Sequence, residues 1–249
     1  MIKKLYENHE TAFCLVLIAV YVIINSVCLQ SFDTTDLRCA LVNLVFSGIL
    51  LALILHLRQA VFYGLKCVRE PRQYAWFLPL VLIASVNLWG GISARNSTGE
   101  ILIHVITMLS VGFSEEIIFR GFLFRMVEKS NLRAAMLVSA LTFGLGHIVN
   151  LLNGAAVLPT LLQLCYAAAL GWLFVVIFHK SGSLLPCILT HGVLNALSIF
   201  CVESEIVTYA GSALLILVSL GYAAVLGKTA GRGDISGTEP NSGNAAGSN

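Results

Sequence analysis

Long apolar segments and short polar ones alternate along almost the whole chain. Windows of about 18–25 mainly apolar residues, the length of a helix that crosses a hydrocarbon core, occur eight times. This pattern predicts an all-α, polytopic membrane protein with about eight transmembrane helices that enclose a polar cavity. The windows cover approximately residues 12–29, 39–57, 74–93, 101–125, 134–152, 158–178, 183–200 and 206–227.

Composition supports the membrane class. Only 11% of the residues are charged and the mean hydropathy is +0.86, whereas soluble domains carry roughly 25% charged residues. We therefore predict a single transmembrane domain over residues 1–227, with its functional core in residues 101–200. Residues 228–249 are rich in Gly, Ser, Asn and Thr, a composition that predicts a disordered, polar cytoplasmic tail.

The positions of Lys and Arg predict the orientation in the membrane. With the N-terminus inside, twelve of these residues fall on the cytoplasmic side, whereas only Arg38 and Arg95 fall outside and Arg120 lies within a span. Cytoplasmic loops of membrane proteins carry an excess of Lys and Arg. Both termini of this integral, multi-pass protein are therefore predicted to be cytoplasmic.

Three charged residues interrupt the fourth apolar window. Glu115, Glu116 and Arg120 lie within six residues of one another, although each charge at the centre of a membrane helix costs about 2.5–3.5 kcal/mol. Glu116 and Arg120 are one turn apart on the same helix face and can form an ion pair. Glu115 projects about a quarter-turn away and has no local partner, so it is the residue predicted to react.

Two later windows carry further polar groups at helical spacing. Phe143 is followed four residues later by His147, and His191 is followed four residues later by Asn195. Counting about 1.5 Å per residue from the predicted helix ends places Glu115 and both histidines at overlapping depths. These groups are therefore expected to meet in one cavity, which we predict to open toward the cytoplasm.

A carboxylate, two imidazoles and an amide at one depth suit the activation of water. Glu115 with His147 could deprotonate a water that attacks a peptide carbonyl, and His191 with Asn195 could donate hydrogen bonds to the oxyanion. A divalent metal such as zinc, bound by Glu115, His147 and His191, could polarise the water instead. The residues themselves leave both mechanisms open.

The three segments resemble the ordered motifs of the CAAX protease and bacteriocin-processing (CPBP, or Abi) family of intramembrane metalloproteases. The resemblance covers about residues 114–195 and implies a membrane endopeptidase, a hydrolase acting on CAAX-type or leader-peptide-like substrates. It implies that Glu115 is the general base with His147, that His191 and Asn195 form the oxyanion site, and that neighbouring residues support the site. The motif residues are Glu115, Glu116, Arg120, Phe143, His147, His191 and Asn195.

Two functions from other classes fit some of the same residues. A catalytically silent bacteriocin-immunity or scaffold protein could bind a partner through the same cavity. A proton-coupled transporter could use Glu115 and the histidines as a relay. The expected partners are the lipid bilayer and a membrane-anchored protein or peptide, without nucleic acid, and the expected location is a bacterial plasma membrane.

Overall fold

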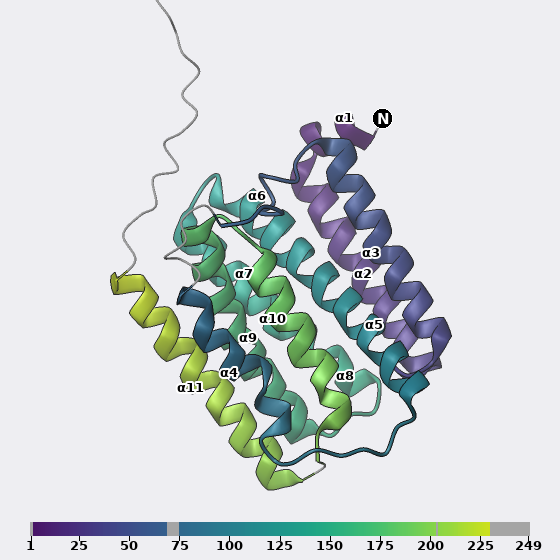
Figure 1. Cartoon of the computed structure of the whole chain (residues 1–249). Helices are drawn as coiled ribbons and strands as arrows, with labels where there is room; N and C mark the ends of the chain where they lie inside the picture. Colours follow the sequence, from purple (N-terminus) through teal and green to yellow (C-terminus); the bar gives the residue numbers. More distant parts are fainter. Residues whose placement is uncertain (1, 69–74, 203, 230–249) are drawn as a thin grey trace, which may run out of the picture.

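The computed structural model describes residues 2–68, 75–202 and 204–229, and every regular element in these ranges is a helix (Figure 1). The predicted all-α, polytopic class is therefore confirmed. The elements are α1 (Ile2–Asn8), α2 (Glu10–Ser31), α3 (Leu37–Leu57), α4 (Leu78–Ala84), η2 (Val86–Leu88), α5 (Thr98–Glu116), η3 (Ile117–Phe124), α6 (Arg125–Glu128), α7 (Leu132–Gly146), α8 (Val149–Leu152), α9 (Val157–Ser181), α10 (Leu185–Ala196), η4 (Leu197–Phe200) and α11 (Glu205–Thr229).

Six helices of the described ranges are long and apolar enough to cross a membrane, and two apolar helices are shorter. The short ones, Ala75–Leu88 and Leu185–Phe200, occupy the third and seventh predicted windows. At about 1.5 Å per residue they span less than a hydrocarbon core of about 30 Å. The first of them ends before Gly91, whose φ of +109° places it outside helical conformations.

Local signals in the sequence set several helix ends. Asp36 accepts a hydrogen bond from the backbone N–H of Arg38 at the start of α3. Ser97 and Glu100 form a reciprocal capping box at the start of α5. These caps pair N–H groups that the first turn of a helix would otherwise leave without partners.

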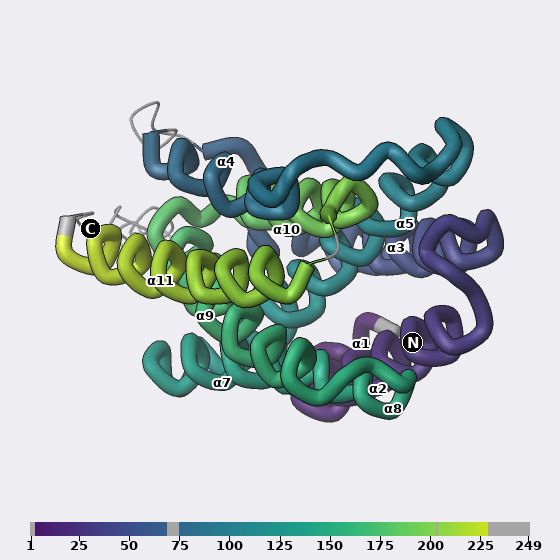
Figure 2. Tube along the Cα trace, turned by 90° about the horizontal axis from the view of Figure 1, so that it is seen from below, coloured from purple at the N-terminus to yellow at the C-terminus, as the bar shows by residue number. Residues whose placement is uncertain are grey.

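The helices α5 and α10 cross at two glycines. A Cβ on Gly112 would lie 2.8 Å from the Cα of Gly192, a separation that side chains do not tolerate. Small residues let membrane helices approach this closely. In the view along the bundle, α10 lies toward the middle, between α4 and α5 on one side and α9 and α11 on the other (Figure 2). The crossing therefore joins α10, which carries His191, to α5, which carries Glu115.

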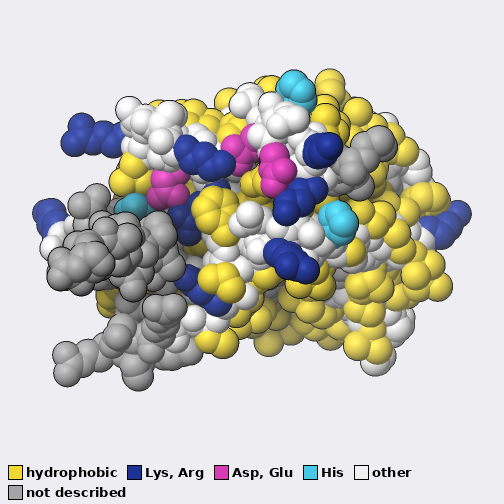
Figure 3. Space-filling model, turned by 90° about the horizontal axis from the view of Figure 1, so that it is seen from above, with side chains coloured by type: hydrophobic (Ala, Val, Ile, Leu, Met, Phe, Trp, Pro, Cys, Tyr) yellow, Lys and Arg dark blue, Asp and Glu magenta, His cyan; other side chains and the backbone are white. Residues whose placement is uncertain are grey.

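The bundle has two chemically different ends. We call one the basic end, because nine of the Lys and Arg side chains in the described ranges lie there and Figure 3 looks onto them. The opposite, or far, end holds the loops 32–36, 89–97 and 153–156 together with residues 197–202, and only two such side chains, Arg38 and Arg95. The basic residues are Lys3, Lys4, Arg58, Lys66, Arg125, Lys129, Arg133, Lys180 and Lys228.

At each end of the bundle, side-chain contacts connect different elements. At the basic end, Lys129 pairs with Glu10 at 2.6 Å. At the far end, Gln30 Nε2 donates to Asn153 Oδ1 at 2.7 Å, so that α2 contacts the loop after α8. The last helix, α11, continues through residue 229, two residues beyond the predicted end of the domain at residue 227, and residues 230–249 lie outside the described ranges.

Candidate active site

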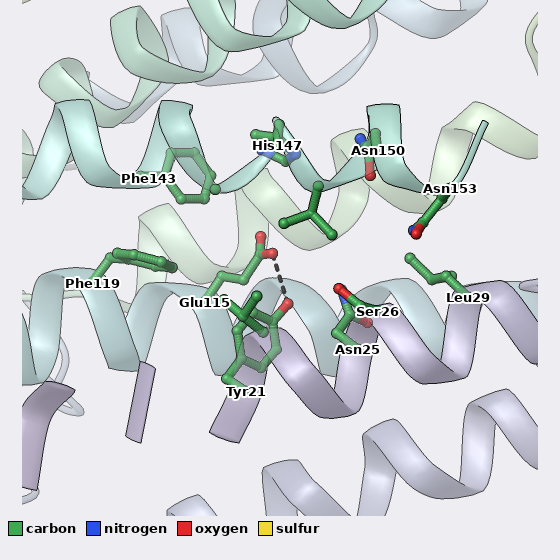
Figure 4. Close-up of a pocket in the computed structure, with 13 residues that line it drawn as sticks. Tyr21, Asn25, Ser26, Leu29, Glu115, Phe119, Phe143, His147, Asn150 and Asn153 are labelled. Carbon is green, nitrogen blue, oxygen red and sulfur yellow. Dashed lines mark hydrogen bonds between the residues drawn. The ribbon is translucent and has the colours of Figure 1, made fainter. Parts of the chain in front are cut away.

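Glu115 is the second-last residue of α5 and points into the bundle. Its side chain is buried, and Oε1 accepts a 2.6 Å hydrogen bond from the hydroxyl of Tyr21 on α2 (Figure 4). Among the described residues, the partners of Glu115 lie on other helices, as the spacing predicts. The sequence predicts His191 as one of them but not Tyr21.

Glu116 and Arg120 form the predicted ion pair. Arg120 Nη1 lies 3.0 Å from Glu116 Oε1, and both side chains have 0% exposure. The guanidinium carbon lies 4.0 Å from the centroid of the Phe143 ring, and Gly171 on α9 leaves space for it, since a Cβ there would approach Nη2 to 2.8 Å. The cation is thus held by a carboxylate and by the face of an aromatic ring.

His191 on α10 lies between the two carboxylates. Its Nδ1 is 2.9 Å from Glu116 Oε1, and its Nε2 is 3.3 Å from Glu115 Oε2. The close crossing at Gly112 and Gly192 makes these contacts possible, because each glycine lies within one turn of a site residue. The ion pair, through Glu116, therefore orients the imidazole toward Glu115.

Phe143 places the second histidine. Its ring centroid lies 5.5 Å from that of His147 and 5.4 Å from that of His191, both edge-on. His147 follows the last residue of α7, where the helix ends. Together with Glu115 it lines the pocket drawn in Figure 4. The groups from the fourth, fifth and seventh apolar windows, which form α5, α7 and α10, therefore meet in the structure as expected.

A cavity of about 300 Å³ extends from Glu115 and His147 toward the far end. Carboxamide side chains make up most of its polar lining, and Asn195 belongs to them. The structure thus brings all four predicted catalytic residues to one site: three line this cavity and His191 contacts Glu115. The polar lining residues are Asn25, Asn87, Glu115, His147, Asn150, Gln163, Tyr166, Asn195 and Ser198.

The residues that line the cavity lie on the far-end side of Glu115, while its predicted opening toward the cytoplasm stays a prediction. Beyond Glu115 toward the basic end the chain forms the π-helix η3, in which all eight residues, 117–124, are buried. The Phe122 ring lies 4.5 Å from that of Tyr63, itself 1% exposed. This aromatic layer fills the space between the site and the basic end.

The side chains as placed do not form a metal site. Among the described residues, no group of three His, Cys, Asp or Glu side chains is arranged to hold a metal ion. His191 directs its two ring nitrogens at two carboxylates, and His147 contacts the ring of Phe143. The three ligands named for zinc therefore do not converge on one point, and we derive no step through a metal.

Three residues at the site were missed by the sequence reasoning. Tyr21 holds Glu115, while Asn87 Nδ2 donates to Leu194 O at 2.7 Å and His104 Nε2 lies 3.3 Å from Asn195 O. A signal for Tyr21 did exist, since it and Asn25 are polar and one turn apart in an apolar window. For Asn87 and His104, only the tertiary packing shows that they contact α10.

The comparison with family models supplies a match to the core of the site. Residues 95–197 match the model described as type II CAAX prenyl endopeptidase, Rce1-like. This segment is similar to the Rce1-like family. The match confirms the resemblance to the CAAX protease family, and it includes every motif residue but not Tyr21. Comparisons with the curated proteins and with the solved structures found no match.

The family and the fold together establish a coarse function. The matched family is one of endopeptidases, and the six long apolar helices make this an integral membrane protein. The protein therefore has the general character of an intramembrane protease, whose surroundings are a lipid bilayer and whose partner is a protein substrate.

Proposed function

We propose that the protein hydrolyses a peptide bond in a membrane-associated protein or peptide, with Glu115 as the general base. The observation that carries this proposal is the position of Glu115: a buried carboxylate at the inner end of a cavity that His147 also lines. A general base needs a water within hydrogen-bond reach and a site that excludes bulk solvent. The cavity supplies room for a water and for a peptide.

The proton follows a path that the contacts support. Oε1 of Glu115 is occupied by the Tyr21 hydroxyl, so Oε2 faces the reacting groups. The carboxylate removes a proton from the water, the hydroxide forms a C–O bond with the peptide carbonyl carbon, and the same proton passes to the leaving amine as the C–N bond breaks. His147 orients the water. Each residue performs a step that general acid–base catalysis requires.

Charge on the carbonyl oxygen needs donors in the tetrahedral intermediate. Asn195 lines the cavity with Glu115, and the hydrogen bond from Asn87 to the adjacent Leu194 carbonyl fixes that part of α10. His191 would be the second donor, turned by its bond to Glu116. Phe143 and the ion pair of Glu116 are site-supporting, because they hold the imidazole and contact no substrate.

The catalytic unit extends over the single domain proposed for residues 1–227. Tyr21 lies on α2, far outside the matched segment 95–197, yet it bonds directly to the proposed base. The helix α2 is therefore part of the site. A fragment limited to the matched segment would lack Tyr21, the hydrogen-bond donor to Glu115.

Replacement of the base tests the proposal. Glu115→Gln keeps the size of the side chain, and we expect it to lower the cleavage rate about 10²–10⁴-fold. New peptide N-termini are compared by mass spectrometry in membranes of cells that carry the wild-type or the variant protein. Glu100→Gln, at an exposed cap, is the matched control and should leave the products unchanged. Equal products from Glu115→Gln and wild type would disprove the role, and no products from either would favour a silent scaffold.

A resident metal is tested separately. Since the described side chains form no three-ligand set, we expect purified active protein to contain substoichiometric zinc by elemental analysis and to keep its activity in a chelator. Stoichiometric zinc that is lost together with activity, and is absent from His147→Ala, would show that the ligands rearrange around a metal.

A further inference from the structure

We propose that Cys28 and Cys39 form a disulfide bond that joins α2 to α3 at the far end of the bundle. Both cysteines lie outside the segment 95–197 that matches the family model. The proposal rests on the placement of the two thiols in the fold, and it does not depend on the reaction that the site performs.

The two sulfur atoms lie against each other. Cys28 Sγ is 3.0 Å from Cys39 Sγ, and the two residues are 3% and 0% exposed. The sulfurs of a disulfide lie about 2.05 Å apart, so a movement of about 1 Å is enough to form the bond. The two residues lie in the last turn of α2 and the first turn of α3, and residues 32–36 connect these turns. A hairpin of this kind brings the pair together as it folds.

The surroundings of the pair suit a disulfide better than a metal. Asn43 Nδ2 donates to Cys39 O at 3.0 Å and lies 3.9 Å from Cys28 Sγ and 3.7 Å from Cys39 Sγ. The polar group beside both sulfurs is therefore an amide. Among the described residues, no group of three His, Cys, Asp or Glu side chains is arranged to hold a metal ion, and two thiolates alone do not complete a zinc site.

Formation of the bond needs an acceptor for two electrons. Each thiol loses its proton and one S–S bond forms. The electrons and protons pass to the disulfide of a thiol oxidoreductase or of a small thiol compound, which is released as two thiols. Because both sulfurs are buried in the folded bundle, this exchange takes place before the hairpin packs against the other helices. Disulfides persist in oxidising surroundings, and the orientation predicted from Lys and Arg places this end outside the cytoplasm.

The bond attaches a helix that few buried side chains hold in place. Cys14, Tyr21 and Cys28 are the buried residues of α2. Cys28 follows Tyr21 by about two helical turns, so the two side chains point to the same face of α2. Tyr21 donates the hydrogen bond to Glu115. A covalent bond at Cys28 therefore fixes the rotation and the axial position of the helix that supplies this donor.

The helix α3 is in turn attached to α5. Ser47 Oγ donates to Ser110 O at 2.9 Å and lies 2.9 Å from Ser114 Oγ. The connection between α2 and α3 contacts α5 as well, since Thr34 Oγ1 lies 2.9 Å from His104 Nδ1. The disulfide thus makes α2 and α3 one unit that is anchored on the helix carrying the proposed base.

Mass spectrometry of the protein from cells tests the bond directly. Cells are quenched in acid, and the protein is denatured and purified in N-ethylmaleimide, which blocks free thiols, and is digested without reductant. We expect Cys28 and Cys39 in one linked peptide in most molecules, and in separate peptides after reduction. Cys187, a buried thiol that contacts a backbone carbonyl, is the control and should carry maleimide. Maleimide on both Cys28 and Cys39 in most molecules would overturn the proposal.

The unfolding temperature in detergent gives a second measurement. Replacing both residues, with Cys28→Ala and Cys39→Ala, should lower it by roughly 5 °C. A reductant present during the scan should lower the unfolding temperature of the wild type by a similar amount and leave the double variant unchanged, because only the wild type has a bond to reduce. Cys14→Ala, at a buried position on the same helix, should keep the sensitivity to reductant. A wild type that unfolds at one temperature with and without reductant would contradict the bond.

Neither measurement requires activity, and the peptide measurement needs no variant that might fail to fold. The same linked peptide is expected from Glu115→Gln. A linked peptide together with unchanged cleavage by Glu115→Gln would disprove the base and leave the disulfide standing. Free thiols together with loss of cleavage would do the reverse.

Discussion

The two halves of the bundle bury polar groups in different ways. Toward the basic end, Arg120 and Glu116 are fully enclosed, and their partners are each other, His191 and the ring of Phe143. Toward the far end, carboxamides line a cavity with room for water and ligand. Glu115 lies at the boundary, with a buried side chain whose neighbours include both the ion pair through His191 and the cavity.

This difference separates the residues that support the site from the residues that can react. A charge removed from water must be paired, because its desolvation is otherwise uncompensated. The half toward the basic end, which we call the closed half, satisfies this rule with an ion pair that has no access to substrate. The half toward the far end, which we call the open half, leaves hydrogen-bonding groups available to a ligand. Asn25 Oδ1 is one of them. One residue of separation in the sequence, between 115 and 116, places the two carboxylates on different sides of this boundary.

The largest expected effect comes from breaking the closed half. Arg120→Ala leaves Glu116 buried without its cation, and we expect a loss of about 3–5 kcal/mol of stability, measured as the shift of thermal unfolding in detergent. Arg38→Ala, an exposed arginine at the far end, is the control and should unfold as wild type does.

The pair itself is tested by removing both charges. Glu116→Gln with Arg120→Met should recover most of the stability, since a neutral pair needs no compensation, yet activity should stay low because His191 loses its partner. If the single Arg120→Ala variant unfolds at the wild-type temperature, the buried ion pair has no structural role.

A smaller effect is expected where the halves join. Gly112→Ala places a methyl group against Gly192, and overpacking of this kind costs about 1–3 kcal/mol. It should also move His191 away from the carboxylates and lower the cleavage rate. Gly48→Ala is the matched control, because a Cβ there has nothing within 4 Å. Equal unfolding temperatures for the two variants would contradict the close crossing of α5 and α10.

The smallest effect belongs to the open half. Tyr21→Phe removes one hydrogen bond to Glu115, with an expected loss of about 0.5–1.5 kcal/mol and of roughly tenfold in rate at most. The informative readout is the rate of cleavage at saturating substrate, which should fall because the carboxylate loses the donor that holds it in place. Tyr222→Phe, whose hydroxyl bonds a carbonyl away from the site, should leave the rate unchanged.

Contacts within one helix could be predicted from the sequence, whereas contacts between helices could be predicted only in part. The ion pair of Glu116 and Arg120 follows from a spacing of four residues, and the same spacing joins Phe143 to His147. Tyr21 was missed because the polar face that it forms with Asn25 does not indicate which other helix this face meets. His104 was missed for the same reason.

Depth along the membrane was easier to predict than direction. Counting residues brought Glu115 and the histidines to one level, as the structure has them. Which side of that level is filled depends on how Phe119, Phe122 and Phe124 pack against other helices, and residue counts carry no such information. The ends of the two short helices likewise could not be predicted from the sequence, because apolar residues continue past them.

The π-helix η3 has a consequence for how the chain tolerates deletion. A π-helix holds about one residue more per turn than an α-helix and is rarely longer than one turn. Loss of a single residue from Ile117–Phe124 could therefore restore ordinary winding while leaving the span apolar and long enough. Because the shortened stretch regains α-helical winding, the residues after it would keep nearly the same angular position, and Glu128 would still face His179, its partner at 3.0 Å. The same deletion within α5, where the winding is already α-helical, would instead rotate everything downstream by about 100°. In this stretch the winding and the number of residues together set the angular phase between the carboxylates and the basic end of their helix.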